Sequence, residues 1–411
     1  MAKQTRILHG DGAQGSNEKR TSRTTGTVSE PHKQLTQRSA SSTARVASSA
    51  GKQGSAVHSL RVYVGMSGGV DSSVTAALLK QEGYNVVGVY MKNWTKSLPG
   101  FECPWKEDYQ DAKRVAVQLG IEFKVFDFEK QYKQKVVDYM IAEYKAGRTP
   151  NPDIMCNQEV KFKLFLEAAL EDGANLIATG HYAKTKDGKL YMAKDSNKDQ
   201  TYFLYRVTED ALKKTLFPLG DYTKPEVRKL AKKFGLVTAT KKESMGICFV
   251  GKVGIKEFLG QYVQTGPGKI IDQSAGQQGQ VIGEHEGAIF YTIGQRQGLG
   301  LGGGLPYYVV GKDMQKNEVY VTTDLADKAL WADELTLGDI HWIHPTSPST
   351  STLNKLSIRT RHRAPLIHCK ATLIDKNTLH VKLLDEIRAA TPGQSAVLYN
   401  GKECIGGGII C

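Results

Sequence analysis

Short apolar runs alternate with longer amphipathic stretches along the first well-patterned part of the chain. The apolar runs have the length of buried strands and lie at 61–66, 85–91, 121–128 and 175–180. Between them, apolar residues recur at helical spacing, which predicts helices at about 71–82, 106–119, 129–145 and 157–172. Strands that alternate with helices form a parallel sheet covered on both faces. The pattern therefore predicts an α/β fold whose ligands bind at the carboxyl ends of the strands.

The pattern changes after residue 205. Residues 205–262 have a helical pattern, and the clearest helix is TKPEVRKLAKKFG, with Pro225 in its first turn and Gly235 past its end. From about 265 the chain is rich in Gly, Val and Thr. Short alternating runs such as KNEVYVTT, CKATLIDK, LHVKLL and SAVLYNG predict strands there. These runs predict two small β-rich units that meet near residue 330, the second of them a β-barrel.

These patterns divide the chain into four parts. Residues 1–57 are rich in Ser, Ala and Gly and poor in bulky apolar residues, so we expect a disordered extension. We expect the α/β domain over 58–262, a small central β-rich domain over 263–330 and a C-terminal β-barrel over 331–411.

The charge of the 411-residue chain is +13, of which +6 lies in residues 1–60 and +7 in the rest. A mildly basic folded part fits a polyanionic partner such as nucleic acid, and it equally fits a solvated basic surface. No run of about 18 apolar residues occurs, so we expect no membrane partner. The N-terminal part has few acidic residues but no clear amphipathic Arg-rich helix. We therefore expect a cytoplasmic protein, with a mitochondrial one as the alternative.

Six cysteines lie at 103, 156, 248, 369, 404 and 411, and no two have C-x-x-C spacing. This spacing argues against a zinc ribbon or finger, and the number is too small for a secreted disulfide scaffold. In a reducing compartment a disulfide is catalytic more often than structural. The HWIH stretch at 341–344 has two histidines and no third ligand nearby, so we expect no metal site there.

The stretch RVYVGMSGGVDSSVTAALL, residues 61–79, has the layout of a phosphate-binding loop: strand, Gly-rich turn, helix. Backbone N–H groups at such a helix start can surround phosphate oxygens, and Gly68 and Gly69 permit close approach. Hydroxyl donors come from Ser67, Ser72 and Ser73. An aspartate beside an anion site makes sense if Asp71 faces Mg²⁺. The Walker and dinucleotide-fold spacings are absent, and turn formation with helix capping would explain the same residues.

Two cysteines are candidate nucleophiles. Cys156 lies in NPDIMCNQEVKF and Cys248 in ESMGICFVG, each in a loop-like stretch. A single cysteine is most often a small buried hydrophobe, and Ile247 and Phe249 suit that interpretation for Cys248. Cys156 precedes the helix predicted over 157–172, whose N-terminus would favour the thiolate. The residues alone leave both interpretations open.

The motif S-G-G-x-D-S after a strand resembles the signature of the PP-loop ATP pyrophosphatases, whose fold is adenine nucleotide alpha hydrolase-like. A longer series of motifs, in order from about 61 to the C-terminus, is similar to the tRNA-specific 2-thiouridylase family. The series is GMSGGVDSS, MKNW, GRTPNPDIMCN, ATGHYA, KDQTYFL, FPLG, ESMGICFVG, YTIGQRQGLG, YYVVGKD and TRHRAP. Residues before 58 are outside this resemblance.

The resemblance implies a reaction. ATP, with Mg²⁺, adenylates the C2 oxygen of wobble uridine 34 in tRNA, and sulfur from a persulfide then gives 2-thiouridine. Cys248 matches the cysteine that receives sulfur from a donor protein, such as a cysteine desulfurase or a sulfur relay protein. Cys156 matches its partner, so a transient Cys156–Cys248 disulfide is implied. Asp153 is a candidate general acid or base, or a contact to the base; a turn-forming role after Pro152 is the alternative. The family suggests the tRNAs for Lys, Glu and Gln.

The resemblance also implies binding residues. The implied ATP site comprises Gly65, Met66, Ser67, Gly68, Gly69, Val70, Asp71 and Ser72, with Met91 and Gly180 beside the adenine and ribose. The implied contacts to the target base are Asn151, Pro152 and Asp153. The implied contacts to the rest of the tRNA are Lys198, Asp199, Gln200, Arg361 and His362. The family commonly has an aromatic residue where this chain has His362, which leaves that contact less defined. We expect His181 to be structural or adjacent to the nucleotide.

Two other functions fit part of this pattern. Another PP-loop enzyme, such as an amidotransferase-type synthetase or a tRNA lysidine synthetase, would not need Cys156 and Cys248 as a pair. A non-catalytic RNA-binding protein with the loop as an ATP sensor would bind tRNA, leave no modified nucleoside and release no pyrophosphate.

Overall fold

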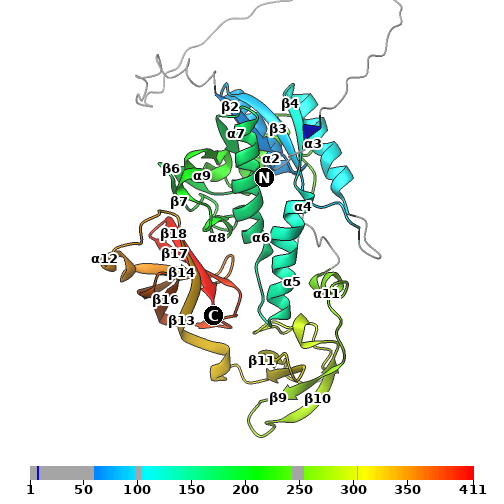
Figure 1. Cartoon of the computed structure of the whole chain (residues 1–411), viewed down its shortest axis with the longest axis vertical. Coiled ribbons are helices and arrows are strands. Elements are labelled where there is room, and N and C mark those ends of the chain that lie inside the picture. Colours follow the sequence, from blue (N-terminus) through cyan, green and yellow to red (C-terminus); the bar gives the residue numbers. More distant parts are fainter. Residues whose placement is uncertain (1–6, 9–59, 98–102, 243–253, 303) are drawn as a thin grey trace, which may run out of the picture.

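The computed structural model describes residues 7–8, 60–97, 103–242, 254–302 and 304–411, and it shows an α/β domain followed by two β-rich parts (Figure 1). Cys248 and nearly all of the expected N-terminal extension lie outside these residues. The α/β domain contains a six-stranded sheet in the order β1-β4-β3-β2-β5-β8. Its strands are β1 (Ile7–Leu8), β2 (Arg61–Gly65), β3 (Asn85–Lys92), β4 (Glu122–Asp127), β5 (Leu176–Ala178) and β8 (Thr215–Leu216). All neighbours are parallel except β1, which adds antiparallel to the edge strand β4.

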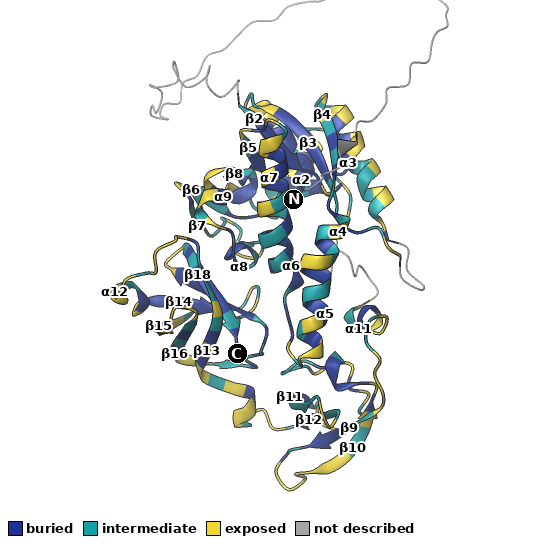
Figure 2. Cartoon of the chain, in the orientation of Figure 1, coloured by how far each residue is buried: buried dark blue, intermediate teal, exposed yellow. Residues whose placement is uncertain are grey.

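Helices cover both faces of this sheet, because successive side chains of each strand point to opposite faces. Val62 and Val64 pack in one buried cluster, and Tyr63 between them packs in the other. The Val62 face is covered by α2 (Val70–Gln81), α3 (Trp105–Leu119) and α10 (Lys224–Lys233). The Tyr63 face is covered by α4 (Glu129–Tyr132), η1 (Lys133–Val137), α5 (Asp138–Lys145), α6 (Pro152–Met155), η2 (Cys156–Leu164) and α7 (Phe165–Glu171). Figure 2 shows the buried residues concentrated in the sheet and on the helix sides that face it. The α/β prediction is confirmed.

The helix that carries Cys156 starts earlier than predicted. Segments α6, η2 and α7 follow one another without a break from Pro152 to Glu171, so the predicted start at 157 was wrong. The Asn151 side chain accepts a hydrogen bond from the Asp153 N–H at 3.2 Å and caps the helix. Pro152 stands at the first helical position, where its fixed φ suits a helix and its missing N–H costs nothing. Cys156 is therefore inside the helix, one turn after its start.

The region 205–262 is less helical than predicted. Besides α9 (Glu209–Lys213), α10 and α11 (Ile255–Leu259), it contains the strand β8 and the short 3-10 helix η3 (Pro218–Asp221). Further short elements upstream of it were not predicted: the hairpin β6 (Lys184–Lys186) and β7 (Lys189–Tyr191), and α8 (Thr201–Leu204). Two- and three-residue strands carry too little periodicity to be recognised. They form because a neighbouring strand supplies their hydrogen bonds.

The central part is a four-stranded sheet in the order β10-β9-β12-β11. Its strands are β9 (Gly268–Asp272), β10 (Gln280–His285), β11 (Tyr308–Asp313) and β12 (Glu318–Thr322), accompanied by the short helices η4 (Ala288–Phe290) and η5 (Lys328–Leu330). Ile270, Val309, Val319 and Val321 form its buried core. Helix α5 extends from the α/β domain toward this sheet (Figure 1).

The last part is a closed barrel of six strands in the order β13-β16-β15-β14-β17-β18, closed by pairing of β13 with β18. Its strands are β13 (Trp331–Trp342), β14 (Leu356–Arg359), β15 (Ile367–Asp375), β16 (Thr378–Arg388), β17 (Ser395–Asn400) and β18 (Glu403–Ile410), with the short helix α12 (Thr350–Leu353). The predicted barrel is confirmed. Strand β7 of the α/β domain pairs with β18, so the two domains share a sheet edge. Within the described ranges, no helix combines the length and apolar character needed to cross a bilayer.

Candidate active site

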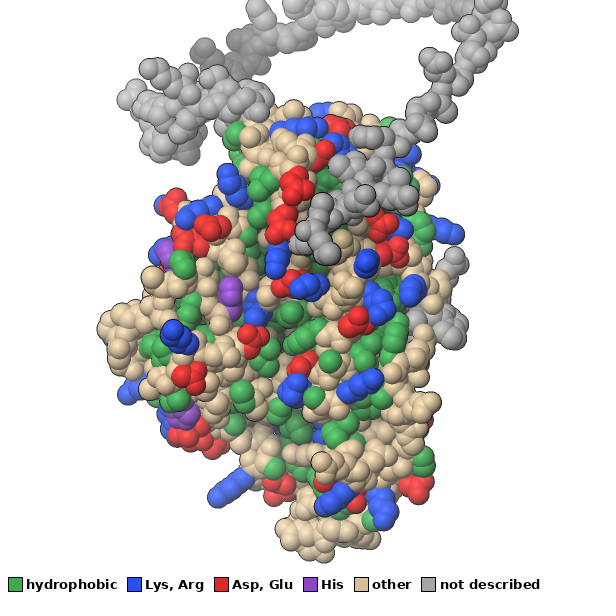
Figure 3. Space-filling model, in the orientation of Figure 1, with side chains coloured by type: hydrophobic (Ala, Val, Ile, Leu, Met, Phe, Trp, Pro, Cys, Tyr) green, Lys and Arg blue, Asp and Glu red, His purple; other side chains and the backbone are tan. Residues whose placement is uncertain are grey.

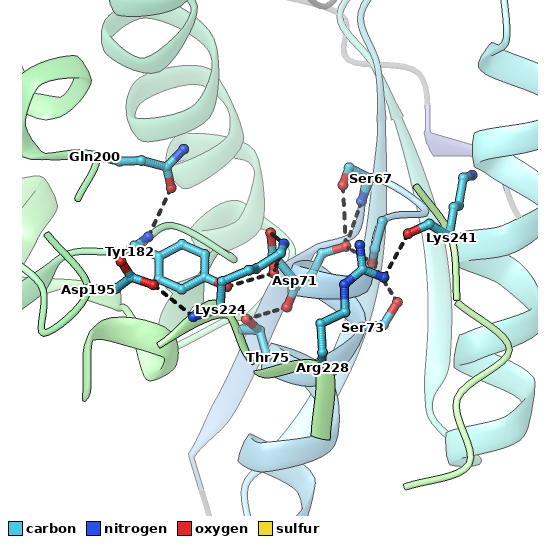
Figure 4. Close-up of polar contacts among 12 residues, drawn as sticks. Ser67, Asp71, Ser73, Thr75, Tyr182, Asp195, Gln200, Lys224, Arg228 and Lys241 are labelled. Atoms are coloured by element: carbon cyan, nitrogen blue, oxygen red, sulfur yellow. Dashed lines mark hydrogen bonds and ion pairs between the residues drawn. The ribbon is translucent and has the colours of Figure 1, made fainter. Parts of the chain in front are cut away.

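The phosphate loop joins β2 to α2 and leaves the start of that helix open. Gly69 occupies the N-cap position, and no side chain caps the helix. The first N–H groups of an α-helix have no partner inside the helix, so they are available to an anion. The Ser67 backbone N–H donates to the Ser72 hydroxyl at 3.2 Å, and the Ser67 and Ser72 hydroxyls lie 3.3 Å apart (Figure 4). The serines thus fold the loop back onto the helix start.

Glycines allow two other segments to pack directly against this loop. Gly68 has a φ of +73°, and a Cβ there would collide with the backbone carbonyl group of Asp108 in α3. A Cβ on Gly180 would lie 2.8 Å from the backbone nitrogen of Ser72. A Cβ on Gly65 would lie 2.9 Å from the methyl group of Met91. The structure therefore places the predicted nucleotide residues Gly65, Met91 and Gly180 around the loop.

The Asp71 carboxylate is held from two sides. Lys224 Nζ donates to both carboxylate oxygens, at 2.8 and 2.7 Å, and the Tyr182 hydroxyl donates to one of them at 2.9 Å. The Tyr182 backbone N–H donates in turn to the Gln200 side-chain oxygen at 2.9 Å (Figure 4). Gln200, predicted to contact tRNA, therefore supports the turn that packs on the phosphate loop.

His181 links the phosphate loop to the Cys156 helix. It follows Gly180, is buried, and its ring centroid lies 5.7 Å from that of Phe162 in η2. Its Nδ1 lies 2.8 Å from the Thr179 hydroxyl. Burial lowers the pKa of His181 well below its usual value, and the positive charge of Lys161 lowers it further. A neutral, enclosed imidazole agrees with the expected structural role.

Asp153 and Cys156 lie in the first turns of the helix that Asn151 caps. Desolvation raises the pKa of the half-buried Asp153 carboxyl, and the charge of Lys161 opposes that shift. The Cys156 side chain is only 3% exposed. Cys156 is therefore largely shielded from solvent in this structure.

All three folded parts meet just before Asn151. The Thr149 backbone N–H donates to the Pro392 carbonyl oxygen in the barrel at 2.9 Å. The Gln394 side chain donates to the Thr149 carbonyl oxygen at 2.7 Å. The Thr149 and Thr292 hydroxyls, the latter from the central part, lie 3.2 Å apart. The segment predicted to meet the target base is thus fixed to both β-rich parts.

The remaining residues predicted to contact tRNA differ in how far they are exposed to solvent. Asp199 is 1% exposed, and its carboxylate accepts a hydrogen bond from Arg359 in the barrel at 3.2 Å. Its side chain therefore joins two domains and is not presented to solvent. Arg361 is exposed, and the half-buried His362 ring lies 4.7 Å, centroid to centroid, from that of Phe203. Lys198, beside Asp199, is half-buried.

Cys248 lies outside the described residues, but both ends of its segment are placed. On the N-terminal side, Lys241 Nζ donates to Asp108 at 2.9 Å and to Asp111 at 2.6 Å. Asp108 is the residue against which Gly68 packs. On the C-terminal side, Phe258 is buried in the same apolar cluster as Cys156. The chain thus leaves the described region beside the phosphate loop and re-enters it at a helix that packs in the large apolar cluster containing Cys156.

Several site residues were missed by sequence reasoning: Tyr182, Lys224, Lys241 and Arg359. Lys224 stands at the start of the helix predicted from TKPEVRKLAKKFG, but its partner Asp71 is 153 positions away. On the face shown in Figure 3, Lys and Arg are interspersed with Asp and Glu. Among the residues with assigned positions, no three His, Cys, Asp or Glu side chains gather as a metal site.

Comparisons with known proteins agree with this architecture. Three family models match in succession: the tRNA methyl transferase HUP domain at 60–252, the tRNA methyl transferase PRC-barrel domain at 256–323 and the aminomethyltransferase beta-barrel domain at 332–410. The tRNA-specific 2-thiouridylase MnmA of Bacillus cytotoxicus is 46% identical over 358 residues, which cover 86% of this chain and 95% of that protein. The protein of the same name from Bacillus subtilis (strain 168) is 47% identical over 355 residues, covering 85% and 94%.

Solved structures are more distant. NMN synthetase from Francisella tularensis is 17% identical, with a TM-score of 0.30, and covers 45% of this chain and 66% of its own. A 4-thiouridine synthetase in complex with RNA and bound ATP is 19% identical, with a TM-score of 0.33, and covers 49% and 50%.

Proposed function

The chain belongs to the tRNA-specific 2-thiouridylase family, and from that premise we propose that it is a tRNA-uridine 2-sulfurtransferase. In this proposal the enzyme adenylates the C2 oxygen of wobble uridine 34 and replaces that oxygen with sulfur. The observation that carries the proposal is the convergence of an open helix start, at Gly69, with the Asn151-capped helix that bears Cys156. The two are connected through Gly180, His181 and Phe162.

The phosphate loop fits a nucleotide triphosphate. The helix start at Gly69 has no side-chain cap, so its N–H groups can bind phosphate oxygens. Mg²⁺ is usually held by one or two carboxylates together with substrate phosphates, and Asp71 is the carboxylate of this loop. When bound, Mg-ATP would supply an AMP group that makes the C2 oxygen a leaving group. Met91 and Gly180 would border the adenine and ribose.

Two cysteines would carry the sulfur. A donor protein, such as a cysteine desulfurase or a sulfur relay protein, would leave a persulfide on Cys248. The terminal sulfur would attack C2 and displace AMP, while the Cys156 thiolate attacks the Cys248 sulfur and breaks the S–S bond. The two cysteines would end as a disulfide. Their oxidation to that disulfide supplies the two electrons that the transferred sulfur takes up. An external thiol reductant would then regenerate both thiols.

Asp153 would act as a general acid or base in this reaction. Desolvation raises the pKa of its carboxyl, and a raised pKa makes a carboxyl better able to take up a proton. It stands one turn before Cys156, next to Asn151 and Pro152, in the segment proposed to meet the target base. A uridine must leave its stack before its C2 face can be reached, so the base would be flipped into this region.

The β-rich parts would hold the tRNA. We propose the division at 58–262, 263–330 and 331–411, in which the α/β domain carries catalysis and Arg361 and His362 of the barrel contact tRNA. Lys198 and Gln200 would add tRNA contacts from the α/β domain. Asp199 would act indirectly, by holding Arg359. The substrates would be the wobble-uridine tRNAs for Lys, Glu and Gln, and the reaction would take place in the cytoplasm.

The test is nucleoside mass spectrometry on unmodified tRNA-Lys incubated with protein, Mg-ATP and a cysteine desulfurase system. Wild type, Cys156→Ser and Cys248→Ser would be compared, with Cys411→Ser as the matched control, because Cys411 is exposed. We expect 2-thiouridine from wild type and Cys411→Ser, only with ATP, and none from the other two. Pyrophosphate release without 2-thiouridine from wild type would favour another PP-loop enzyme. Binding of tRNA with neither product would favour a non-catalytic protein.

A further inference from the structure

Lys224 places an ammonium group at the phosphate loop from a distant part of the chain. It is the first residue of α10, and its Nζ lies 2.8 and 2.7 Å from the two oxygens of Asp71 (Figure 4). The Lys224 side chain is 11% exposed and that of Asp71 31%, so the pair lies at the inner wall of the site. The ammonium also lies 5.8 Å from the centre of the Tyr182 ring.

The loop itself brings no positive charge to its ligand. Residues 65–73, GMSGGVDSS, contain neither Lys nor Arg. Two other cations drawn in Figure 4 have their partners outside the loop, whereas Lys224 contacts Asp71 within it. Lys241 pairs with Asp108 and Asp111, and Arg228 donates to the carbonyl oxygens of Ala239 and Lys241. Lys224 is therefore well placed to neutralise a bound triphosphate.

The present position of Lys224 conflicts with a metal on Asp71. Mg²⁺ on a carboxylate needs an oxygen lone pair that faces the ion. Here both Asp71 oxygens accept from one ammonium, and a second cation at the same oxygens would be repelled by it. Repulsion between the two cations would therefore favour Mg²⁺ on Asp71 once the ammonium has moved away.

We propose that Lys224 is a nucleotide-binding residue that changes partner. Before the nucleotide binds, it neutralises Asp71; when Mg²⁺ takes the carboxylate, the ammonium turns to the phosphate oxygens. The inference rests on the proposed use of Mg-ATP. It adds a residue that holds the phosphates and explains how the site stays electrically balanced before the nucleotide arrives.

The surroundings of Lys224 fit such a movement. Its backbone is fixed, because its N–H donates to Asp195 at 2.8 Å and Thr223 with Glu226 forms a capping box. Its side chain is a flexible four-carbon chain with a compact charge, which can redirect an ammonium while the helix stays in place. Asp71 stands in the first turn of α2, so an anion at that helix start would lie beside its carboxylate.

The test is a double-mutant cycle on nucleotide binding without metal. In Asp71→Asn the amide cannot form the ion pair, so Lys224 no longer has to leave a carboxylate at position 71 before it contacts phosphate. Calorimetry would measure the affinity of Asp71→Asn for α,β-methylene-ATP in EDTA, with and without Lys224→Met. We expect Lys224→Met to weaken binding about 10-fold or more, the effect of a lost charge-assisted hydrogen bond.

The matched control is Lys194→Met in the same Asp71→Asn background. Lys194 Nζ donates to Glu226 at 2.9 Å, and Glu226 lies in α10, the helix that also carries Lys224. The Lys194 side chain is half exposed. We expect that substitution to change the affinity less than about 2-fold. If Asp71→Asn does not fold, as judged by circular dichroism, the cycle is run with Asp71→Ser.

The outcomes separate the two proposals. If Lys224→Met leaves the Asp71→Asn affinity within 2-fold, the lysine only neutralises Asp71, and the change of partner is overturned. If neither wild type in Mg²⁺ nor Asp71→Asn in EDTA binds the nucleotide, the proposed function is overturned, and this inference is overturned with it. If the Lys194 control weakens binding as much as Lys224→Met, the loss comes from a general change of charge, which also overturns it.

Discussion

The Asp199 carboxylate accepts a hydrogen bond from the Arg359 guanidinium at 3.2 Å, across 160 positions of sequence. The two side chains are 0% and 8% exposed, so the ion pair is buried between the α/β domain and strand β14 of the barrel. Asp199 also accepts from the Ala193 N–H and the Thr201 hydroxyl, at 3.0 and 2.7 Å. A buried carboxylate with this many donors fixes the orientation of the barrel relative to the nucleotide domain.

Removing Arg359 should therefore destabilise the whole fold. Arg359→Met leaves Asp199 buried without its counter-charge, which costs about 3–5 kcal/mol. Urea unfolding would measure the loss. The control is Lys382→Met, which breaks the exposed pairs with Asp333 and Glu334 and should cost about 0–1 kcal/mol. Equal losses for the two variants would contradict a structural role for the buried pair.

His362 should make stability depend on pH. Burial, followed by the charges of Arg363, Arg359 and Lys198, lowers the pKa of His362 to about 4. The unfolded chain takes up this proton near pH 6.5, before the folded protein does, so stability falls as pH drops from about 6.5 toward 4. One such proton gives a slope of at most about 1.4 kcal/mol per pH unit.

The variant that tests this slope is His362→Phe. Phenylalanine keeps a ring against Phe203 but cannot be protonated, so urea unfolding across pH 4.5–7 should give a flatter profile than wild type. His341, whose pKa burial also lowers to about 4, would retain its own share. Identical slopes for wild type and variant would show that His362 is protonated equally in both states. Retained tRNA binding by His362→Phe would support stacking as the role of this position.

The cysteines should differ strongly in reactivity. Cys411 is exposed, whereas Cys369 and Cys404 are 2% and 1% exposed, and burial raises the pKa of Cys369 to about 12. Iodoacetamide labelling at pH 8, followed by mass spectrometry, should modify Cys411 about 100-fold faster than Cys369 or Cys404.

Cys156 is the informative cysteine in the same experiment. At 3% exposure it should be protected in the protein alone. In the proposed reaction the target uridine enters the region of Cys156, so the rate of Cys156 labelling should change when tRNA and Mg-ATP are added. Labelling of Cys156 as fast as Cys411 before any addition would contradict the covered thiol. A rate unaffected by substrate would contradict its proposed role.

Local physics made much of the nucleotide domain predictable. The strands near 61 and 85 are predictable because each is a mainly apolar run between turn residues, a pattern typical of a strand buried on both faces. The strand near 121 is predictable because apolar and charged residues alternate along most of it. The phosphate loop was recognised because Gly68 and the serines around it are the residue types that a tight turn before a helix needs.

The errors came from short or context-dependent elements. The prolines of TPNPD predict a loop up to residue 156, whereas Pro152 behind an Asn151 cap starts the helix. Strand β8 has two residues and exists because β5 pairs with it. The ion-pair partners of Asp71 and Asp199, Lys224 and Arg359, lie more than 150 positions away, and no local pattern specifies them. Sequence therefore identified the chemical groups of the site, while their pairing required the fold.

Substitution of Gly68 should cost more than backbone strain alone, and a second glycine with a similar φ, Gly276, separates the two effects. Gly68→Ala combines a positive φ with a collision against the backbone of Asp108, whereas Gly276→Ala has a similar φ, +81°, and nothing within 4 Å. Left-handed backbone costs a non-glycine residue about 1–2 kcal/mol, so Gly276→Ala should lose about that much stability and keep its nucleotide affinity. In Gly68→Ala the loop or α3 must also shift, so we expect a larger loss in urea unfolding and nucleotide binding weakened at least about 10-fold. If Gly68→Ala loses no more stability than Gly276→Ala and binds nucleotide normally, the packing of α3 against the loop does not shape the phosphate site.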